Sequence, residues 1–100
     1  MRAYETLFII RPDLEEEQTE AVVEKFTELL KTNGAEIIKL DKWGKRKMAY
    51  MVAKHWEGYY VLCQFKSEPE ASHELERVFR ITDEVIRFLV TRIDEEVEAS

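Results

Sequence analysis

The sequence predicts an α+β domain in which two helices cover one face of a four-stranded antiparallel sheet. Two segments, 13–32 and 67–80, carry apolar residues at the i, i+4, i+7, i+8 spacing of a helix that lies on a sheet. Other segments alternate their side chains or are rich in β-branched and aromatic residues, as strands are. With 100 residues, the chain is long enough for one hydrophobic core and one domain.

The first strand is predicted over residues 2–10 and the first helix over residues 13–32. The strand presents Tyr4, Thr6, Phe8 and Ile10 on one face, and Leu7 and Ile9 on the other. Apolar residues on both faces indicate a central strand. Asp13 is the expected N-cap of the helix, with Glu16 at the spacing of a capping box. Asn33-Gly34 is expected to end the helix with a left-handed residue.

Residues 35–40 and 48–52 are predicted as extended stretches of a second strand. Ile37 and Ile38 are adjacent, so the facing of this strand is ambiguous and a β-bulge is possible. Residues 54–58 are expected to form the turn that leads into the next strand. Together the two strands predict a long hairpin.

The remaining elements are a third strand over residues 59–66, a second helix and a last strand over residues 85–91. The helix is expected to start at Ser67 as its N-cap, followed by an early proline, Pro69. It should end between residues 80 and 83. In the last strand, Ile86, Phe88 and Val90 share one face, and Arg87 and Leu89 share the other.

The predicted element order is βαββαβ. Two helices with one apolar stripe each can cover only one face of the sheet, and right-handed crossovers then give the ferredoxin-like fold with strand order 2-3-1-4. We expect residues 1–93 to form this single domain. Residues 94–100 are expected to be an acidic, flexible C-terminal tail.

The charge of the chain is unevenly distributed. The net charge is −6, yet the window from Lys39 to Trp56 holds six basic residues and one acidic residue. That window therefore carries +5 and the rest of the chain −11. A compact cationic patch on an anionic body suits a protein that approaches phosphate at one place only.

The residue patterns of common enzymes are absent from the sequence. The three glycines are isolated, no Cys-x-x-Cys is present, and neither histidine has an acid partner placed beside it. Cys63 lies in an apolar run and is expected to be a buried structural thiol. We therefore predict no enzymatic activity, cofactor, metal or small-molecule substrate. Without an apolar segment of membrane-spanning length or a secretory signal, a cytoplasmic location is expected.

The face of the sheet away from the helices is predicted to be apolar. It would carry the row Leu7, Ile9, Tyr60, Leu62 and Leu89. Such a patch is larger than a solitary monomer usually shows. Either loops or the hairpin arm cover part of it, or a protein partner binds there, and we favour the partner.

The basic window favours nucleic-acid binding, although a solvated hairpin is the alternative for so short a run. Lys45, Arg46 and Lys47 alternate sides on a strand and would grip a backbone. Arg2 and Arg87 are expected to lie near this patch in the predicted sheet. Trp43, Tyr50 and Trp56 lie among the basic residues and are candidates for stacking on a base or ribose. The first strand offers Leu7 and Ile9 where a sequence-reading RNA module would carry aromatic residues. Recognition of shape and phosphate is therefore expected.

The chain resembles the bacterial small-subunit ribosomal protein six family along nearly its whole length. The resemblance lies in Met1-Arg2-Ala3-Tyr4-Glu5, Gly44-Lys45-Arg46-Lys47-Met48-Ala49-Tyr50, Gly58-Tyr59-Tyr60 and the strand around Arg87. The segment that ends in Met48-Ala49-Tyr50 is the specific part. Met51 departs from the proline that many members have after this tyrosine.

The resemblance implies a ferredoxin-like fold without enzymatic activity. It also implies a role in the small ribosomal subunit, in which the chain pairs with small-subunit protein eighteen and the pair binds the central domain of the rRNA. The residues assigned to rRNA are Arg2, Lys45, Arg46, Lys47, Lys54 and Arg87. The residues assigned to the partner protein are Leu7, Ile9, Tyr50, Tyr60, Leu62 and Leu89. The alternative is a ligand-binding or regulatory domain that self-associates through its open sheet.

Overall fold

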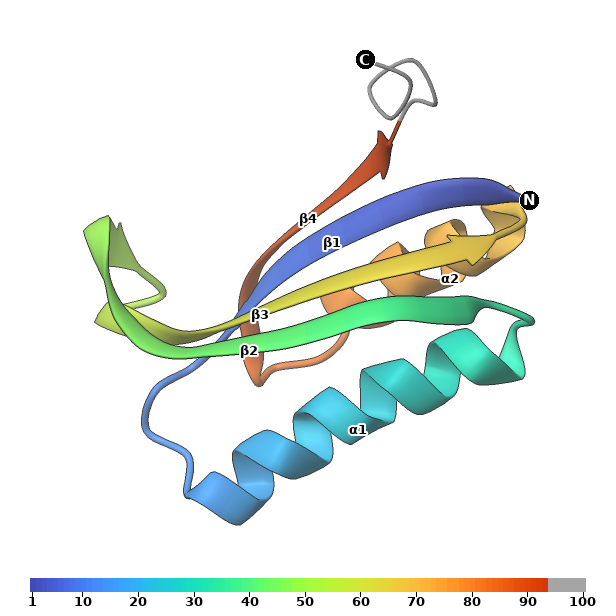
Figure 1. Ribbon diagram of the computed structural model, residues 1–100. Helices are drawn as coiled ribbons and strands as arrows, with labels where there is room; N and C mark the ends of the chain where they lie inside the picture. The colour runs from blue at the N-terminus through green and yellow to red at the C-terminus, as the bar shows by residue number, and fades with distance from the viewer. Residues whose placement is uncertain (94–100) are drawn as a thin grey trace.

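The computed structural model describes residues 1–93 and confirms the predicted order of elements (Figure 1). The elements are β1 (Arg2–Ile10), α1 (Glu16–Thr32), β2 (Glu36–Val52), β3 (His55–Ser67), α2 (Pro69–Arg80) and β4 (Val85–Ile93). The strands form one antiparallel sheet in the predicted order, β2-β3-β1-β4. The predicted acidic tail, residues 94–100, lies outside the described residues.

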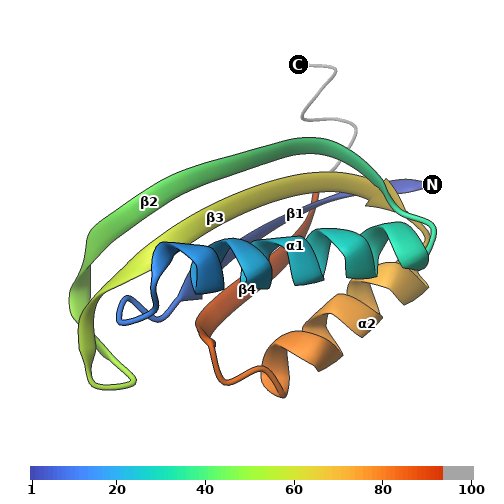
Figure 2. The ribbon, with the colours of Figure 1, turned by 90° about the horizontal axis from the view of Figure 1, so that it is seen from below.

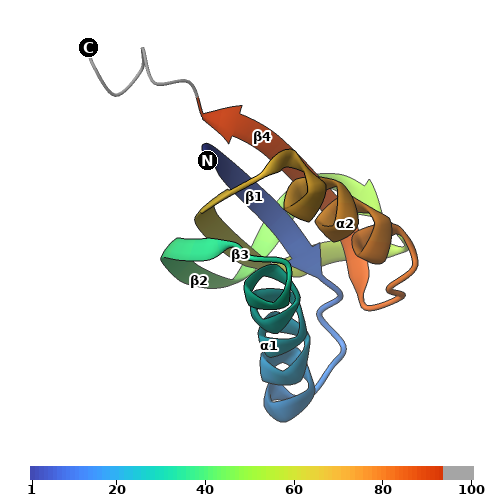
Figure 3. The same cartoon turned by 90° about the vertical axis from the view of Figure 1, so that its right-hand side faces the viewer.

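Both helices lie on the same face of the sheet, as predicted (Figure 2). β1 is the central strand and pairs with β3 on one side and with β4 on the other. Its residues Tyr4, Thr6, Phe8 and Ile10 are buried toward the helices. The N-terminus lies beside the end of β4, because Ala3 pairs with Ile93 (Figure 3). No helix within residues 1–93 is long and apolar enough to cross a membrane.

Three buried phenylalanines meet in the core, and a fourth, partly buried one packs against them. The ring of Phe79 in α2 lies 4.5 Å from that of Phe26 in α1 and 5.0 Å from that of Phe8 in β1. It also stacks on Phe88 of β4, with the ring centroids 5.0 Å apart. Tilted and stacked pairs at these distances are favourable for aromatic rings. Phe79 therefore joins both helices to two strands of the sheet.

The start of α1 differs from the prediction. Its N-cap is Glu15 and not Asp13. The backbone N–H of Glu15 donates to Oε1 of Gln18 at 3.0 Å, which is the reciprocal bond of a capping box. Asp13 instead forms an ion pair with Arg11, with 3.3 Å between its Oδ1 and Nε of the arginine. The end of α1 is as predicted, with Gly34 at φ +83°.

The start of α2 is also shifted from the prediction by one residue. Ser67 is the last residue of β3, where it pairs with Arg2 and is buried. Its hydroxyl donates to the carbonyl of Glu68 at 2.9 Å and is thus not a cap. Glu68 is the N-cap and Pro69 the first helical residue, the position where proline is tolerated best.

β2 is the long second strand that was predicted, and its 17 residues also include residues 41–47 between the two predicted stretches. The bulge that the adjacent isoleucines suggest is present, because the register with β3 shifts between Ile37 and Lys39. A second shift follows between Lys42 and Gly44, where Gly44 has φ +83°. A third shift lies between Lys47 and Val52, in the part of the strand nearest the hairpin loop. The three shifts allow so long a strand to bend.

The predicted turn over residues 54–58 is wrong. The chain reverses at Ala53 and Lys54, which have φ +49° and +69°, and Val52 pairs with His55. Positive φ at both central residues is typical of a two-residue hairpin loop, which usually contains glycine or asparagine. Gly58 is instead a buried residue of β3, packed against Ile9. This glycine therefore allows close packing within a strand and does not mark a turn.

Candidate functional site

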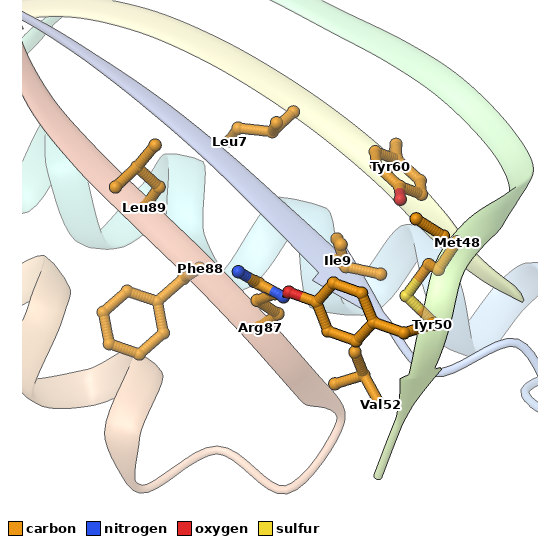
Figure 4. Close-up of a pocket in the computed structure, with 10 residues that line it drawn as sticks. Leu7, Ile9, Met48, Tyr50, Val52, Tyr60, Arg87, Phe88 and Leu89 are labelled. Carbon is orange, nitrogen blue, oxygen red and sulfur yellow. The ribbon is translucent and has the colours of Figure 1, made fainter. Parts of the chain in front are cut away.

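β2 and β3 extend beyond the rest of the sheet as a two-stranded arm, residues 45–58, which bends away from the plane of the sheet (Figure 1). Nη1 of Arg87 on β4 donates a hydrogen bond to the hydroxyl of Tyr50 on the arm. The guanidinium carbon of Arg87 also lies 5.3 Å from the centroid of the Tyr50 ring. Figure 4 shows Tyr50 reaching Arg87 across the space between the two strands. This pair fastens the arm to β4.

A cavity of about 370 Å³ lies between the arm and the face of the sheet opposite the helices, which we call the open face. It is lined by Leu7, Ile9, Met48, Ala49, Tyr50, Val52, Tyr60, Arg87, Phe88 and Leu89 (Figure 4). Ile9 is only 6% exposed, whereas Leu89 is 59% exposed. The arm therefore covers part of the open face, which was one of the two alternatives, and leaves the β4 side accessible.

Five of the six residues assigned to a protein partner, all except Leu62, line this cavity. Leu62 is half-buried and pairs with Leu7, so it continues the apolar row on the same face. Met48 and Val52 also line the cavity but were not assigned to the site. The sequence did contain a signal that places Met48 and Val52 at this site. Each is two residues from Tyr50 on the same strand, and residues two apart on a strand share a face.

An aromatic and cationic cluster lies where the arm joins the sheet. The rings of Trp43 and Tyr60 are stacked, with centroids 6.2 Å apart and planes 12° from parallel. The guanidinium carbon of Arg46 lies 5.2 Å from the centroid of the Trp43 ring. The open face thus carries two arginines, Arg46 and Arg87, each over an aromatic ring.

The three consecutive basic residues alternate sides, as predicted. Arg46 belongs to the open face, whereas Lys45 lines a cavity on the helix side together with Glu16, Glu20 and Tyr59. Alternation puts Lys47 on the same side as Lys45. The sequence therefore overstates the positive charge that any one face of the arm presents.

Lys42, another member of the basic window, is paired within the molecule. Its Nζ lies 2.7 Å from Oε2 of Glu20 on α1. The hydrogen bond to Glu20 raises the pKa of Lys42. This ion pair joins β2 to α1 on the helix side, away from the open face.

The remaining predicted rRNA residues are spread along the sheet. Lys54 is exposed at the tip of the arm. Arg2 pairs with Ser67 at one end of β3, while Arg46 pairs with Gly58 near the other. At about 3.3 Å per residue this separation is about 30 Å along the strand. The expectation that Arg2 lies near the patch is therefore wrong, whereas Arg87 does lie beside the arm.

Cys63 is the buried thiol that the sequence predicts, at 2% exposure. Burial raises the pKa of its thiol to about 11. The thiol therefore stays protonated near neutral pH and is a poor nucleophile.

The bond between Tyr50 and Arg87 can be tested by Tyr50→Phe, which removes the hydroxyl but keeps the ring. We expect the free energy of unfolding to fall by about 0.5–1 kcal/mol, the lower part of the range for a hydrogen bond, because Tyr50 is exposed. Amide hydrogen exchange of residues 48–52 should become faster, while exchange in β1 stays unchanged. Equal exchange on the arm in both proteins would mean that this bond does not hold the arm.

Comparisons with known proteins agree with the resemblance. The family model described as "Ribosomal protein S6" matches residues 3–92. The small ribosomal subunit protein bS6 of Moorella thermoacetica is 57% identical over 96 residues, which cover 96% of this chain and 98% of the relative. That of Thermoanaerobacter pseudethanolicus is 53% identical and covers 95% of this chain and 100% of the relative.

Solved structures show the same fold. The crystal structure of 30S ribosomal protein S6 from Thermotoga maritima has a TM-score of 0.91 at 34% identity, over 98% of this chain and 92% of that one. The C-terminal domain of the MgtC protein from Mycobacterium tuberculosis has a TM-score of 0.62 at 11% identity, which concerns the fold alone. The chain belongs to the ribosomal protein S6 family, whose members are proteins of the small ribosomal subunit in the bacterial cytoplasm.

Proposed function

We propose that the chain is a structural, non-catalytic component of the small ribosomal subunit that binds the central domain of its rRNA together with small-subunit protein eighteen. The main support for this proposal is the arrangement of charged and apolar groups on the open face. The open face presents Arg46 and Arg87, each over an aromatic ring, on either side of an apolar cavity. Cations suit a phosphate backbone, and an apolar surface between them suits a protein partner.

The two arginines supply the contacts to RNA. A guanidinium group can bind phosphate oxygens with two parallel hydrogen bonds. Arg46 and Arg87 each rest on an exposed aromatic ring, Trp43 and Tyr50, so less side-chain freedom is lost when a phosphate binds. These contacts fix the position of the backbone without reading bases.

The apolar part of the open face takes the protein partner. Leu89 is more than half exposed, and it also lines the cavity under the arm, so the exposed apolar surface is continuous with that cavity. The chain carries a net charge of −6, so a basic partner at this face would reduce repulsion from RNA. The chain alone is therefore expected to bind RNA weakly.

The cavity also favours a second candidate function. A volume of about 370 Å³ with a mostly apolar lining falls in the range of small-molecule sites. In that case the chain would be a ligand-binding or regulatory domain that self-associates through its open face. Arg46 lies outside the cavity lining, so ligand affinity would not depend on it.

Arg46→Glu tests the proposed contact to RNA. We expect at least a tenfold weaker recruitment of the heterodimer to a central-domain rRNA fragment, because the change removes one phosphate contact and adds a repulsive charge. Lys31→Glu is the matched control, since it makes the same change of charge on the exposed surface of α1. Equal recruitment by the two variants, at equal stability, would contradict the assignment of the patch.

The tip of the arm offers a second test, through Ala53→Gly and Lys54→Gly. Both remove a non-glycine residue from the left-handed region, so each should raise the free energy of unfolding by about 0.5–1 kcal/mol. Only Lys54→Gly also removes a charge, and only this variant should weaken RNA recruitment. Thermal unfolding and RNA titration of both proteins separate the two effects, and equal recruitment by both would exclude Lys54 from the contact.

A further inference from the structure

We propose that Trp43 is a positioning residue that holds the guanidinium of Arg46 in place for a phosphate, and that its ring does not stack on an RNA base. The inference rests on the proposed function and assigns a separate role to Trp43 and to Arg46 in binding RNA. Trp43 and Trp56 are equal candidates for base stacking in the sequence. Their environments in the structure differ.

Three side chains restrain the indole of Trp43. Its Nε1–H donates to Oδ2 of Asp41 at 3.1 Å, which fixes the direction of the ring. Tyr60 on the neighbouring strand stacks nearly parallel to it, and Arg46 lies over it at 5.2 Å. A ring with a hydrogen bond, a stacked tyrosine and a guanidinium beside it is already held in one orientation within the molecule.

The exposed fractions of the two tryptophan side chains also differ, in the direction that a restrained Trp43 and an unrestrained Trp56 would give. Trp43 is 37% exposed, whereas Trp56 on the arm is 62% exposed. A base that stacked on Trp43 would compete with Arg46 for the ring, and the arginine would lose its support. Trp56 has no such restraint among the contacts found in residues 1–93, so it is the aromatic control for the experiment below.

The physical role of Trp43 is to reduce the freedom of a long side chain. Arg46 lies on β2, an edge strand, where an unsupported arginine would sample many rotamers. The ring attracts the guanidinium electrostatically and leaves its edge free to donate to phosphate. Since Asp41 and Tyr60 orient the ring, the position of Arg46 is set by groups that do not touch RNA.

The test is a double-mutant cycle between Trp43→Leu and Arg46→Ala. The readout is the affinity of the heterodimer with small-subunit protein eighteen for a central-domain rRNA fragment, over a salt series. We expect Trp43→Leu to weaken binding about three- to tenfold, and the double variant to bind no more weakly than Arg46→Ala alone. Trp43→Phe, which keeps an aromatic face, should restore most of the affinity. Trp56→Leu should show no coupling to Arg46.

Each outcome bears on one of the two proposals. If the full loss from Trp43→Leu persists in the Arg46→Ala background, Trp43 contacts RNA itself and the positioning role is wrong. The same conclusion follows if Trp43→Leu leaves affinity unchanged while Arg46→Ala lowers it. If Arg46→Ala changes neither the affinity nor its salt dependence, the proposed RNA contact fails instead. Should Trp43→Leu not fold, Arg46→Lys replaces it, because lysine keeps the charge but lacks the planar group, and undiminished affinity would overturn the role.

Discussion

Phe79→Ala is expected to lower the free energy of unfolding by about 3–5 kcal/mol, the cost of truncating a buried phenylalanine. Phe79 is 1% exposed, and its ring contacts phenylalanines on α1, β1 and β4. The cavity left behind would border both helices and the sheet, so no single neighbour can fill it. Denaturant unfolding, followed by circular dichroism, measures the change.

The control for this prediction is Ile81→Ala, two residues further along the chain. Ile81 is 67% exposed, so its truncation should change the free energy of unfolding by no more than about 0.5 kcal/mol. Because Phe79→Ala removes a large part of the stability of a small domain, Phe79→Leu gives a milder variant for the same measurement. A loss below about 1 kcal/mol for Phe79→Ala would mean that the aromatic core is packed differently.

Gly58→Ala should also destabilise the protein, by about 1–3 kcal/mol, because it overfills a packed site. Gly58 is buried in β3, and a Cβ at this position would collide with Cγ2 of Ile9. That methyl group is attached directly to the branched Cβ of Ile9 and cannot swing away. Thermal or denaturant unfolding of the variant measures the cost.

The cause of this cost can be isolated with Ile9→Ala, which removes the obstructing methyl group. We expect the change at Gly58 to be much cheaper in the Ile9→Ala background than in the parent protein, since the two residues share one space. Equal costs in both backgrounds would show that the collision with Ile9 is not the cause, since the φ of Gly58 lies outside the left-handed region that favours glycine.

The elements with strong local signals were predictable from the sequence. β1 was correct to the residue because Tyr4, Phe8 and Ile10 alternate cleanly with residues of the open face. Both helices followed from their apolar stripes, but their starts were misassigned by one or two residues. Asp13 and Ser67 have the side chains of good caps, yet Arg11 pairs with the first and β3 contains the second.

The arm was less predictable, because its geometry depends on contacts between distant parts of the chain. The reversal at Ala53 and Lys54 uses residues with no turn preference, so no local signal marked it. The bond between Tyr50 and Arg87 joins residues 37 positions apart. Lys42 was counted in the basic patch because it is close in sequence to the other basic residues. In the folded chain its charge is paired with Glu20 of α1, which lies 22 residues earlier in the sequence.

Binding of rRNA by the open face and the arm, together with a protein partner, can be tested directly. Binding of a central-domain rRNA fragment should be measured with and without small-subunit protein eighteen over a series of salt concentrations. We expect salt-sensitive binding that appears when the partner is present, because the chain alone is acidic. Absence of binding under both conditions, together with self-association of the chain, would contradict this expectation and direct attention to a ligand in the cavity under the arm.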